Sequence, residues 1–326
     1  MSNNLASTPR PWLARLHPSL FAMPLGLLGL SGAWRRAVLL GFTIGQPISL
    51  WLLGAGMLLF GVLLLLWLVK LTLHPDAVRQ EWNHPVQGPM LAMMPVTVLL
   101  IVALAAQALP LPFAFWLTLT LGAFALQGVL AWRVVAQLST GKMPPEWVTP
   151  TLYLPTVAGG FVGSMALSAL DLPGWAALLF GMGLGAWALL EVRILNRLFA
   201  GPLPVALRST LGIEIAPAAV GSLAVATLWP ALPADVLMVC LGIASGPLLA
   251  VLTRFQYWSA APFSAGFWSF SFPLAAMAGA MVEAVQRGNW PPLVALVAVL
   301  VASAVIAFLA VRTMVLLGQG KLLPPQ

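Results

Sequence analysis

Few residues in this chain could do acid–base chemistry, and one of them, Glu214, lies inside a long apolar segment. It follows Arg208 by six residues and precedes Pro217 by three. Because an ionisable group in apolar surroundings is costly, a carboxylate there could be a proton-sensitive or cation-sensitive gate. The alternative is a water-exposed carboxylate in a vestibule near the end of the segment, and this second interpretation is the one that we favour.

A second group of polar residues could form a metal site only if its spacing brought the ligands together. It contains two histidines, two acids and an arginine: His74, Asp76, Arg79, Glu81 and His84. It lacks the two histidines four residues apart that bind zinc from one helix face. We therefore predict a solvated loop and no metal.

Other chemistry has no support in the residue types. The single cysteine, Cys240, lies in an apolar segment, so an intramolecular disulfide is excluded and a packing role is predicted. The sequence contains no hydrolytic triad, phosphate-binding loop or dinucleotide-binding fingerprint. We predict that the protein is not an enzyme and has no cofactor.

The composition is that of an integral membrane protein. Of the 326 residues, 61% are hydrophobic and 7% are charged, whereas soluble domains contain roughly 25% charged residues. A helix needs about 20 mostly apolar residues to cross a bilayer. Ten such segments are predicted: 18–34, 44–69, 87–109, 112–136, 151–170, 174–196, 208–229, 233–256, 264–285 and 292–316.

The basic residues predict the orientation of these ten spans. Three of the 15 fall on one side, namely Arg35, Arg36 and Arg287, and the other twelve fall on the side that holds both termini. Cytoplasmic loops are enriched in Lys and Arg, so both termini are predicted to be cytoplasmic. The expected parts are an N-terminal segment (1–17), a transmembrane domain (18–316) and a C-terminal tail (317–326). Dispersed basic residues argue against binding to nucleic acid.

A proline recurs in every odd-numbered span, at intervals of 56 to 71 residues: Pro24, Pro95, Pro155, Pro217 and Pro273. These intervals match a hairpin that crosses the membrane twice, and a proline inside a helix bends it. We predict an all-α fold of five hairpins, with an inner ring of five bent helices around a central pore and an outer ring of five. Glycine pairs in the even spans, Gly41/Gly45, Gly181/Gly185 and Gly242/Gly246, are expected to let helices approach closely.

The residues beside the prolines are the candidates for the pore lining. Met23, Met94, Leu154, Ala216 and Phe272 precede the prolines, Gly159 and Gly160 follow Pro155, and Glu214 lies nearby. Such a lining is narrow and almost uncharged, which is typical of a conduit and lacks the row of carboxylates of a cation pathway.

Several segments together resemble the tellurite-resistance and dicarboxylate transporter family, which includes bacterial TehA and the slow-type anion channels of plant guard cells. The bacterial TehA type is the nearest pattern. The matching segments are FAMPLGLLGLSGAWR (21–35), EWNHPV (81–86), TPTLYLPTVAGGF (149–161), LPVALRSTLGIEIAP (203–217), FWSFSFPLAAMA (267–278) and GKLL (320–323).

The resemblance implies passive conduction of small inorganic anions, a homotrimer with one pore per subunit, and a place in the bacterial inner membrane. It also implies that Phe272 blocks the pore. A positive potential at the cytoplasmic mouth would favour anions, and Arg15 and Arg208 are candidates for it. An anion pathway requires Glu214 to be protonated, paired or turned aside. The alternative function is a proton-coupled or passive exporter of tellurite, sulfite or C4-dicarboxylates, which Glu214 keeps open.

Overall fold

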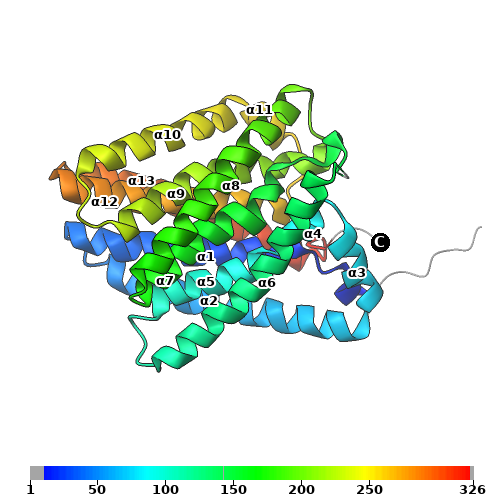
Figure 1. Ribbon diagram of the computed structural model, residues 1–326, viewed down its shortest axis with the longest axis horizontal. Coiled ribbons are helices and arrows are strands. Elements are labelled where there is room, and N and C mark those ends of the chain that lie inside the picture. The colour runs from blue at the N-terminus through cyan, green and yellow to red at the C-terminus, as the bar shows by residue number, and fades with distance from the viewer. Residues whose placement is uncertain (1–10, 142, 324–326) are drawn as a thin grey trace, which may run out of the picture.

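The computed structural model describes residues 11–141 and 143–323, and every regular element in those residues is helical (Figure 1). The longer helices are α1 Ala22–Ala37, α2 Gly45–Leu73, α5 Met93–Ala105, α6 Phe113–Ser139, α7 Gly159–Ala169, α8 Pro173–Phe199, α9 Ala216–Leu228, α10 Ala234–Thr253, α12 Ser271–Gly288 and α13 Pro292–Gly318. Three shorter α-helices, α3 Pro75–Asn83, α4 Gln87–Met90 and α11 Phe255–Ser259, lie at one end of the molecule.

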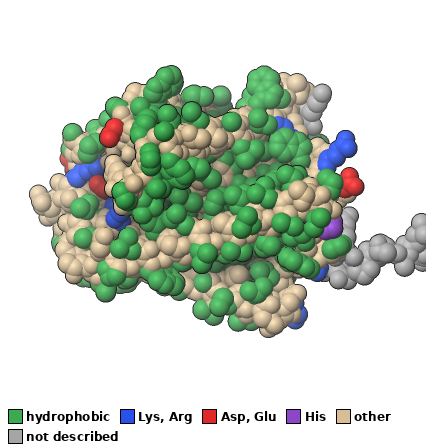
Figure 2. All heavy atoms as spheres, turned by 90° about the horizontal axis from the view of Figure 1, so that it is seen from below, with side chains coloured by type: hydrophobic (Ala, Val, Ile, Leu, Met, Phe, Trp, Pro, Cys, Tyr) green, Lys and Arg blue, Asp and Glu red, His purple; other side chains and the backbone are tan. Residues whose placement is uncertain are grey.

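Nine helical stretches in the described residues are long and apolar enough to cross a membrane. The first predicted span is the exception, because α1 has 16 residues and the four residues before it, Pro18–Phe21, form a separate 3₁₀ turn. On the face shown in Figure 2, hydrophobic side chains cover the middle and charged side chains gather toward the two ends. The predicted all-helical fold is therefore confirmed for the described residues, and the long apolar helices are consistent with a membrane protein.

The five recurring prolines lie where the backbone changes its helical form. Pro24, Pro95, Pro217 and Pro273 stand in the first turn of α1, α5, α9 and α12, and Pro155 lies in a π-helical turn, Leu154–Ala158, before α7. The first turn of an α-helix tolerates proline because its N–H groups have no partner within the helix. Each of these helices follows a 3₁₀, π or short α segment, which before α9 is 11 residues long, Val205–Ile215.

Burial separates the helices into two classes. The membrane-length stretches that contain α5, α7, α9 and α12 are 72 to 83% buried, whereas those of α2, α6, α8, α10 and α13 are 17 to 28% buried. Most of α1 is also buried. Each buried helix contacts two others, in the order α1, α5, α7, α9, α12 and back to α1, and each packs against the exposed helix that follows it.

The segment after α2 corrects the prediction of a solvated loop. Residues 75–83 form α3, and Glu81 on it is buried against the equally buried Lys70 near the end of α2. The Lys70 ammonium forms an ion pair with Glu81 and donates a hydrogen bond to the Leu16 carbonyl at 2.7 Å. Through Lys70, Glu81 of α3 and Leu16 near the N-terminus are both connected to α2.

A buried and an exposed helix approach each other closely at Gly160 of α7 and Gly183 of α8. A methyl group on Gly160 would lie 2.5 Å from the Cα atom of Gly183. Of the glycine pairs predicted for this role, Gly45 at the start of α2 lies close to α1, because a methyl group there would be 2.6 Å from the Trp34 carbonyl oxygen. Around Gly181, Gly185, Gly242 and Gly246, in α8 and α10, a methyl group would meet no described atom within 4 Å. In these helices the expectation was wrong, because those glycines face away from the bundle.

We expect Gly160→Ala to lower the free energy of unfolding by about 1–3 kcal/mol, the usual cost of overpacking against atoms that cannot move. Gly181→Ala is the matched control, because Gly181 lies on the exposed face of α8, the helix that Gly160 contacts. This variant is expected to have little effect. Thermal unfolding of the detergent-solubilised protein measures both. Equal changes for the two variants would contradict the assignment of the contact to Gly160.

Candidate functional site

Three cavities follow one another between the buried helices. For reference, the end of the molecule that carries His17 and His84 is called the histidine end, and the end that carries Arg35 and Arg36 the arginine end. The mouth cavity, about 740 Å³, is lined by His17 and His84. It shares Ser19, Met90 and Thr210 with the smaller central cavity, about 40 Å³. The arginine-end cavity, about 210 Å³, comes next.

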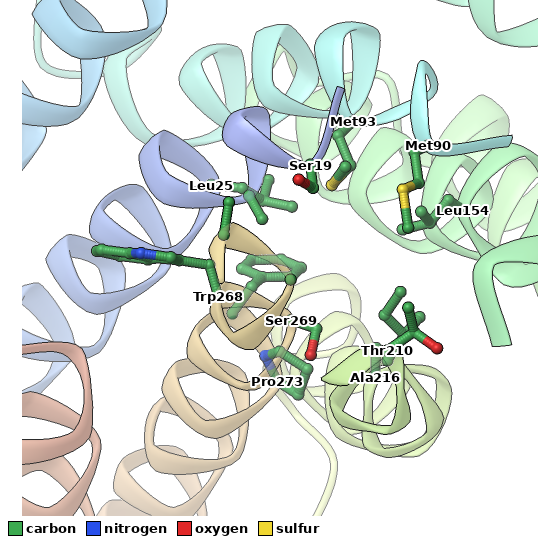
Figure 3. Close-up of a pocket in the computed structure, with 15 residues that line it drawn as sticks. Ser19, Leu25, Met90, Met93, Leu154, Thr210, Ala216, Trp268, Ser269 and Pro273 are labelled. Carbon is green, nitrogen blue, oxygen red and sulfur yellow. The ribbon is translucent and has the colours of Figure 1, made fainter. Parts of the chain in front are cut away.

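The walls of the central cavity come from five separate parts of the chain. Figure 3 shows Leu25, Met93, Leu154, Ala216 and Pro273 arranged around one space, each from a different segment near the start of a buried helix. The remaining labelled side chains are Ser19, Met90, Thr210, Trp268 and Ser269. The polar side chains among these are hydroxyls, so the described lining of this cavity carries no charge.

Phe272 separates the central cavity from the arginine-end cavity. It is the one described residue that lines both, and only 6% of its surface is exposed. Its ring lies against α1, where a methyl group on Gly29 would come within 2.7 Å of Phe272 Cδ2. The absence of a side chain at Gly29 therefore makes room for the ring.

Some of the predicted lining residues line the central cavity, and others pack between helices. Leu154, Ala216 and Phe272 line the central cavity. Met23 and Met94 are buried but line none of the described cavities, and their places are taken by neighbours such as Leu25 and Met93. Adjacent residues of a helix point about 100° apart, so a shift of one residue moves a side chain from the cavity to the helix contact.

Gly159 and Gly160 also face other helices. A methyl group on Gly159 would meet the amide of Gln127 on α6 at 2.5 Å, and Gly160 lies against α8. The Gln127 amide nitrogen donates to the carbonyls of Leu154 and Pro155 at 2.9 and 2.7 Å, which are freed where the helix is interrupted. These glycines let the exposed helices support the turn around Pro155.

Glu214 lies outside the described cavities and is paired. Its carboxylate oxygens accept hydrogen bonds from Arg254 Nη2 at the end of α10, both at 3.2 Å, and only 4% of its side chain is exposed. The carboxylate therefore points from the buried 3₁₀ segment Val205–Ile215 toward an outer helix. The interpretation as a water-exposed vestibule residue does not hold, and the requirement that it be paired or turned aside is met.

The two arginines predicted to attract anions are not among the residues that line the described cavities. Arg208 lies over the Tyr257 ring at 4.2 Å and donates to the Leu203 and Tyr257 carbonyls. Arg15 is partly exposed in a 3₁₀ turn before the histidine end. Instead, Arg35 and Arg36 line the cavity on the far side of Phe272. Their only signal in the sequence was their isolation on the side with few basic residues.

The mouth cavity is bordered by two histidines that act as hydrogen-bond acceptors. His17 Nδ1 accepts from the Ser19 backbone N–H at 3.1 Å and lies 2.7 Å from the Ser19 hydroxyl. His84 Nδ1 accepts from the backbone N–H groups of Val86 and Gln87 at 3.2 Å. Burial, and next the charge of Lys70, lower the pKa of His17 to about 4, and burial lowers the pKa of His84.

Acid is therefore expected to destabilise the histidine end. The pKa of His17 is about 6.5 in the unfolded chain, so its contribution to stability is complete above that pH and is lost as the pH falls toward 4. The melting temperature of the purified protein should fall between pH 7 and pH 5. His17→Asn keeps an acceptor for the Ser19 N–H without a titrating ring, so its melting temperature should depend less on pH; an unchanged slope would contradict the role of His17.

The chain is similar to known proteins along more than nine-tenths of its length. The family model "SLAC1: Voltage-dependent anion channel" matches residues 15–316. The Tellurite resistance protein TehA homolog of Haemophilus influenzae is 28% identical over 303 residues, which cover 92% of this chain and 90% of that protein. The S-type anion channel SLAH3 of Arabidopsis thaliana is 25% identical over 318 residues, 94% of this chain and 49% of its own length. This chain thus spans about half of the plant protein.

Proposed function

The chain belongs to the SLAC1 family of voltage-dependent anion channels, and we propose that it conducts small monovalent anions through a pore in each subunit, closed by Phe272. The family relationship predicted from the sequence motifs is confirmed, and it makes the protein a channel or transporter homologue. The specific ion, the gate and the oligomer belong to the proposal.

The succession of cavities is the observation that carries this proposal. The contacts of α1, α5, α7, α9 and α12 close into a cycle, and the cavities follow one another inside it. In the proposed pore these five helices are the inner ring and their exposed partners the outer ring. An uncharged wall binds ions weakly and so lets them leave, and a single apolar ring can stop them by excluding water.

Membership of the family also supports a bacterial inner-membrane protein with cytoplasmic termini, which would make the histidine end the cytoplasmic one. The excess of basic residues on that side agrees with this orientation. The proposed homotrimer rests on the family resemblance. The exposed faces of α2, α6, α8, α10 and α13 are the surfaces available to lipid and to other subunits.

The alternative is a proton-coupled exporter of tellurite, sulfite or C4-dicarboxylates. Its one specific support in the sequence was Glu214, and the pairing of Glu214 with Arg254 away from the cavities weakens that support. A carrier would give saturable, proton-dependent flux that Glu214→Gln abolishes. We expect instead that Glu214→Gln conducts like the wild type.

Ion-substitution currents test the proposed function. Purified wild-type protein and the Phe272→Ala variant would be recorded in planar bilayers with a gradient of KCl. We expect a current that reverses near the equilibrium potential of chloride. Reversal near that of potassium, or flux without current, would reject an anion channel.

A further inference from the structure

The arginine-end cavity combines two guanidinium groups with direct access to Phe272. Arg35 and Arg36, in the last turn of α1, line it together with Gln107, Ser168 and Thr227. Gln107 is exposed at the surface, so the cavity reaches the exterior at this end. Its volume of about 210 Å³ is well above the ~30 Å³ that one water molecule occupies.

The two guanidinium groups differ in how many of their nitrogens already donate a hydrogen bond to the protein. Arg36 Nε donates to Glu283 Oε1 at 3.1 Å, and its other nitrogens donate to the Gly32 carbonyl and the Thr227 hydroxyl. Arg35 Nη1 donates to the Leu104 carbonyl at 2.7 Å. In the described structure Arg35 Nε and Nη2 have no protein partner and are not enclosed.

The free nitrogens of Arg35 share one edge of its guanidinium plane. Two parallel N–H groups on such an edge match two oxygens of a planar anion, a geometry that a lysine does not provide. The hydrogen bond from Nη1 to Leu104 on α5 fixes the plane, so the free edge is held in place before any ligand arrives. Little entropy is then lost on binding.

The local charge balance leaves the cavity positive. Glu283 accepts from both Arg36 and Arg287, at 3.1 and 3.0 Å, so one carboxylate at this end of the molecule is paired with two guanidinium groups, beside the third guanidinium group of Arg35. The acids in the nearby connections, Asp171 and Asp235, are exposed and do not line the cavity. A basic cavity with apolar walls concentrates anions.

From these contacts we infer that the arginine-end cavity is a binding site for one small planar oxyanion, held on the Nε–Nη2 edge of Arg35. Nitrate is the probe that fits this geometry. Arg36, paired with Glu283 at 3.1 Å, is the neighbouring guanidinium group, and Thr227 and Gln107 are the further polar groups within the cavity. The site rests on the proposed channel function and adds an anion-binding step to it, because an anion bound there would lie in the cavity that Phe272 closes.

Nitrate binding to the purified full-length protein, followed by isothermal titration calorimetry, tests the site without any current. Arg35→Gln is expected to weaken binding about tenfold or more, since charge-assisted hydrogen bonds are the strong ones. Arg35→Lys should recover the charge but only part of the affinity. Arg287→Gln is the matched control, because it removes the same charge at the same end from a residue that does not line the cavity.

Bilayer currents separate this site from the proposed function. We expect the ratio of nitrate to chloride conductance to fall in Arg35→Gln and to stay near the wild-type value in Arg287→Gln. Anion currents with equal nitrate binding in wild type and Arg35→Gln would overturn the site and leave the channel function standing. Binding that depends on Arg35 in a protein that carries no current would support the site and reject the channel. Equal weakening in both glutamine variants would show a diffuse charge effect and overturn the assignment to Arg35.

Discussion

Phe272→Ala is expected to raise the anion conductance of the reconstituted protein by about tenfold or more, the change that follows when a barrier falls by about 1.4 kcal/mol. The reason is geometric, because Phe272 is the one described residue that lines both the central and the arginine-end cavities. Removing its ring would join the two. Single-channel recording in symmetrical chloride measures the change.

Phe270→Ala is the matched control for this prediction. Phe270 lies two residues away in the same segment, is equally buried, and packs against Trp258 with a centroid distance of 4.7 Å rather than lining a described cavity. Its removal should cost stability without raising conductance. If Phe272→Ala folds and conducts no more than the wild type, Phe272 is not the gate.

Breaking the buried pair of Lys70 and Glu81 is expected to cause the largest loss of stability. Lys70 is completely buried, and an uncompensated buried charge typically costs about 3–5 kcal/mol. In Glu81→Ala the ammonium would keep only its hydrogen bond to the Leu16 carbonyl among the partners in the described structure. Thermal unfolding in detergent, with Asp76→Ala as an acidic control on the exposed side of α3, measures the loss.

A double replacement separates the cost of the orphaned charge from that of lost packing. Replacing a buried ion pair by apolar residues is often neutral or stabilising, so Lys70→Met combined with Glu81→Leu should recover most of the stability that Glu81→Ala loses. A double variant as unstable as the single one would show that the pair holds α3 by its hydrogen bonds.

The apolar spans and the helical fold class could be predicted because they depend on composition summed over about twenty residues. The proline repeat likewise indicated which helices are buried, but the prolines were predicted to bend helices from within, and four of the five stand instead in the first turn of a helix. Less could be predicted about which side chains of a helix face the cavity. Met93 and Met94 are adjacent in the sequence, yet only Met93 lines the central cavity. A hydrophobic pattern that is apolar on all sides of a helix holds no information on which side meets the cavity.

Ion pairs between residues far apart in the sequence could not be predicted either. Glu214 was identified as an acid in an apolar span, but its partner Arg254 comes forty residues later, at the far end of α10. The polar segment around Glu81 was predicted to be solvated because nothing local shows that Lys70 is buried against it. Phe272 was singled out by the family resemblance; from its residue type alone it was a packing residue.

The thinness of the barrier has an electrical consequence. If solution fills the cavities on both sides of Phe272, the membrane potential falls mainly across the depth of one aromatic ring instead of across the whole bilayer. A monovalent ion that passes the ring then experiences nearly all of the ~2.3 kcal/mol that each 100 mV supplies per elementary charge. Voltage would act on the permeating ion at this single step, and the curvature of the current–voltage relation would report what fraction of the membrane potential falls across it.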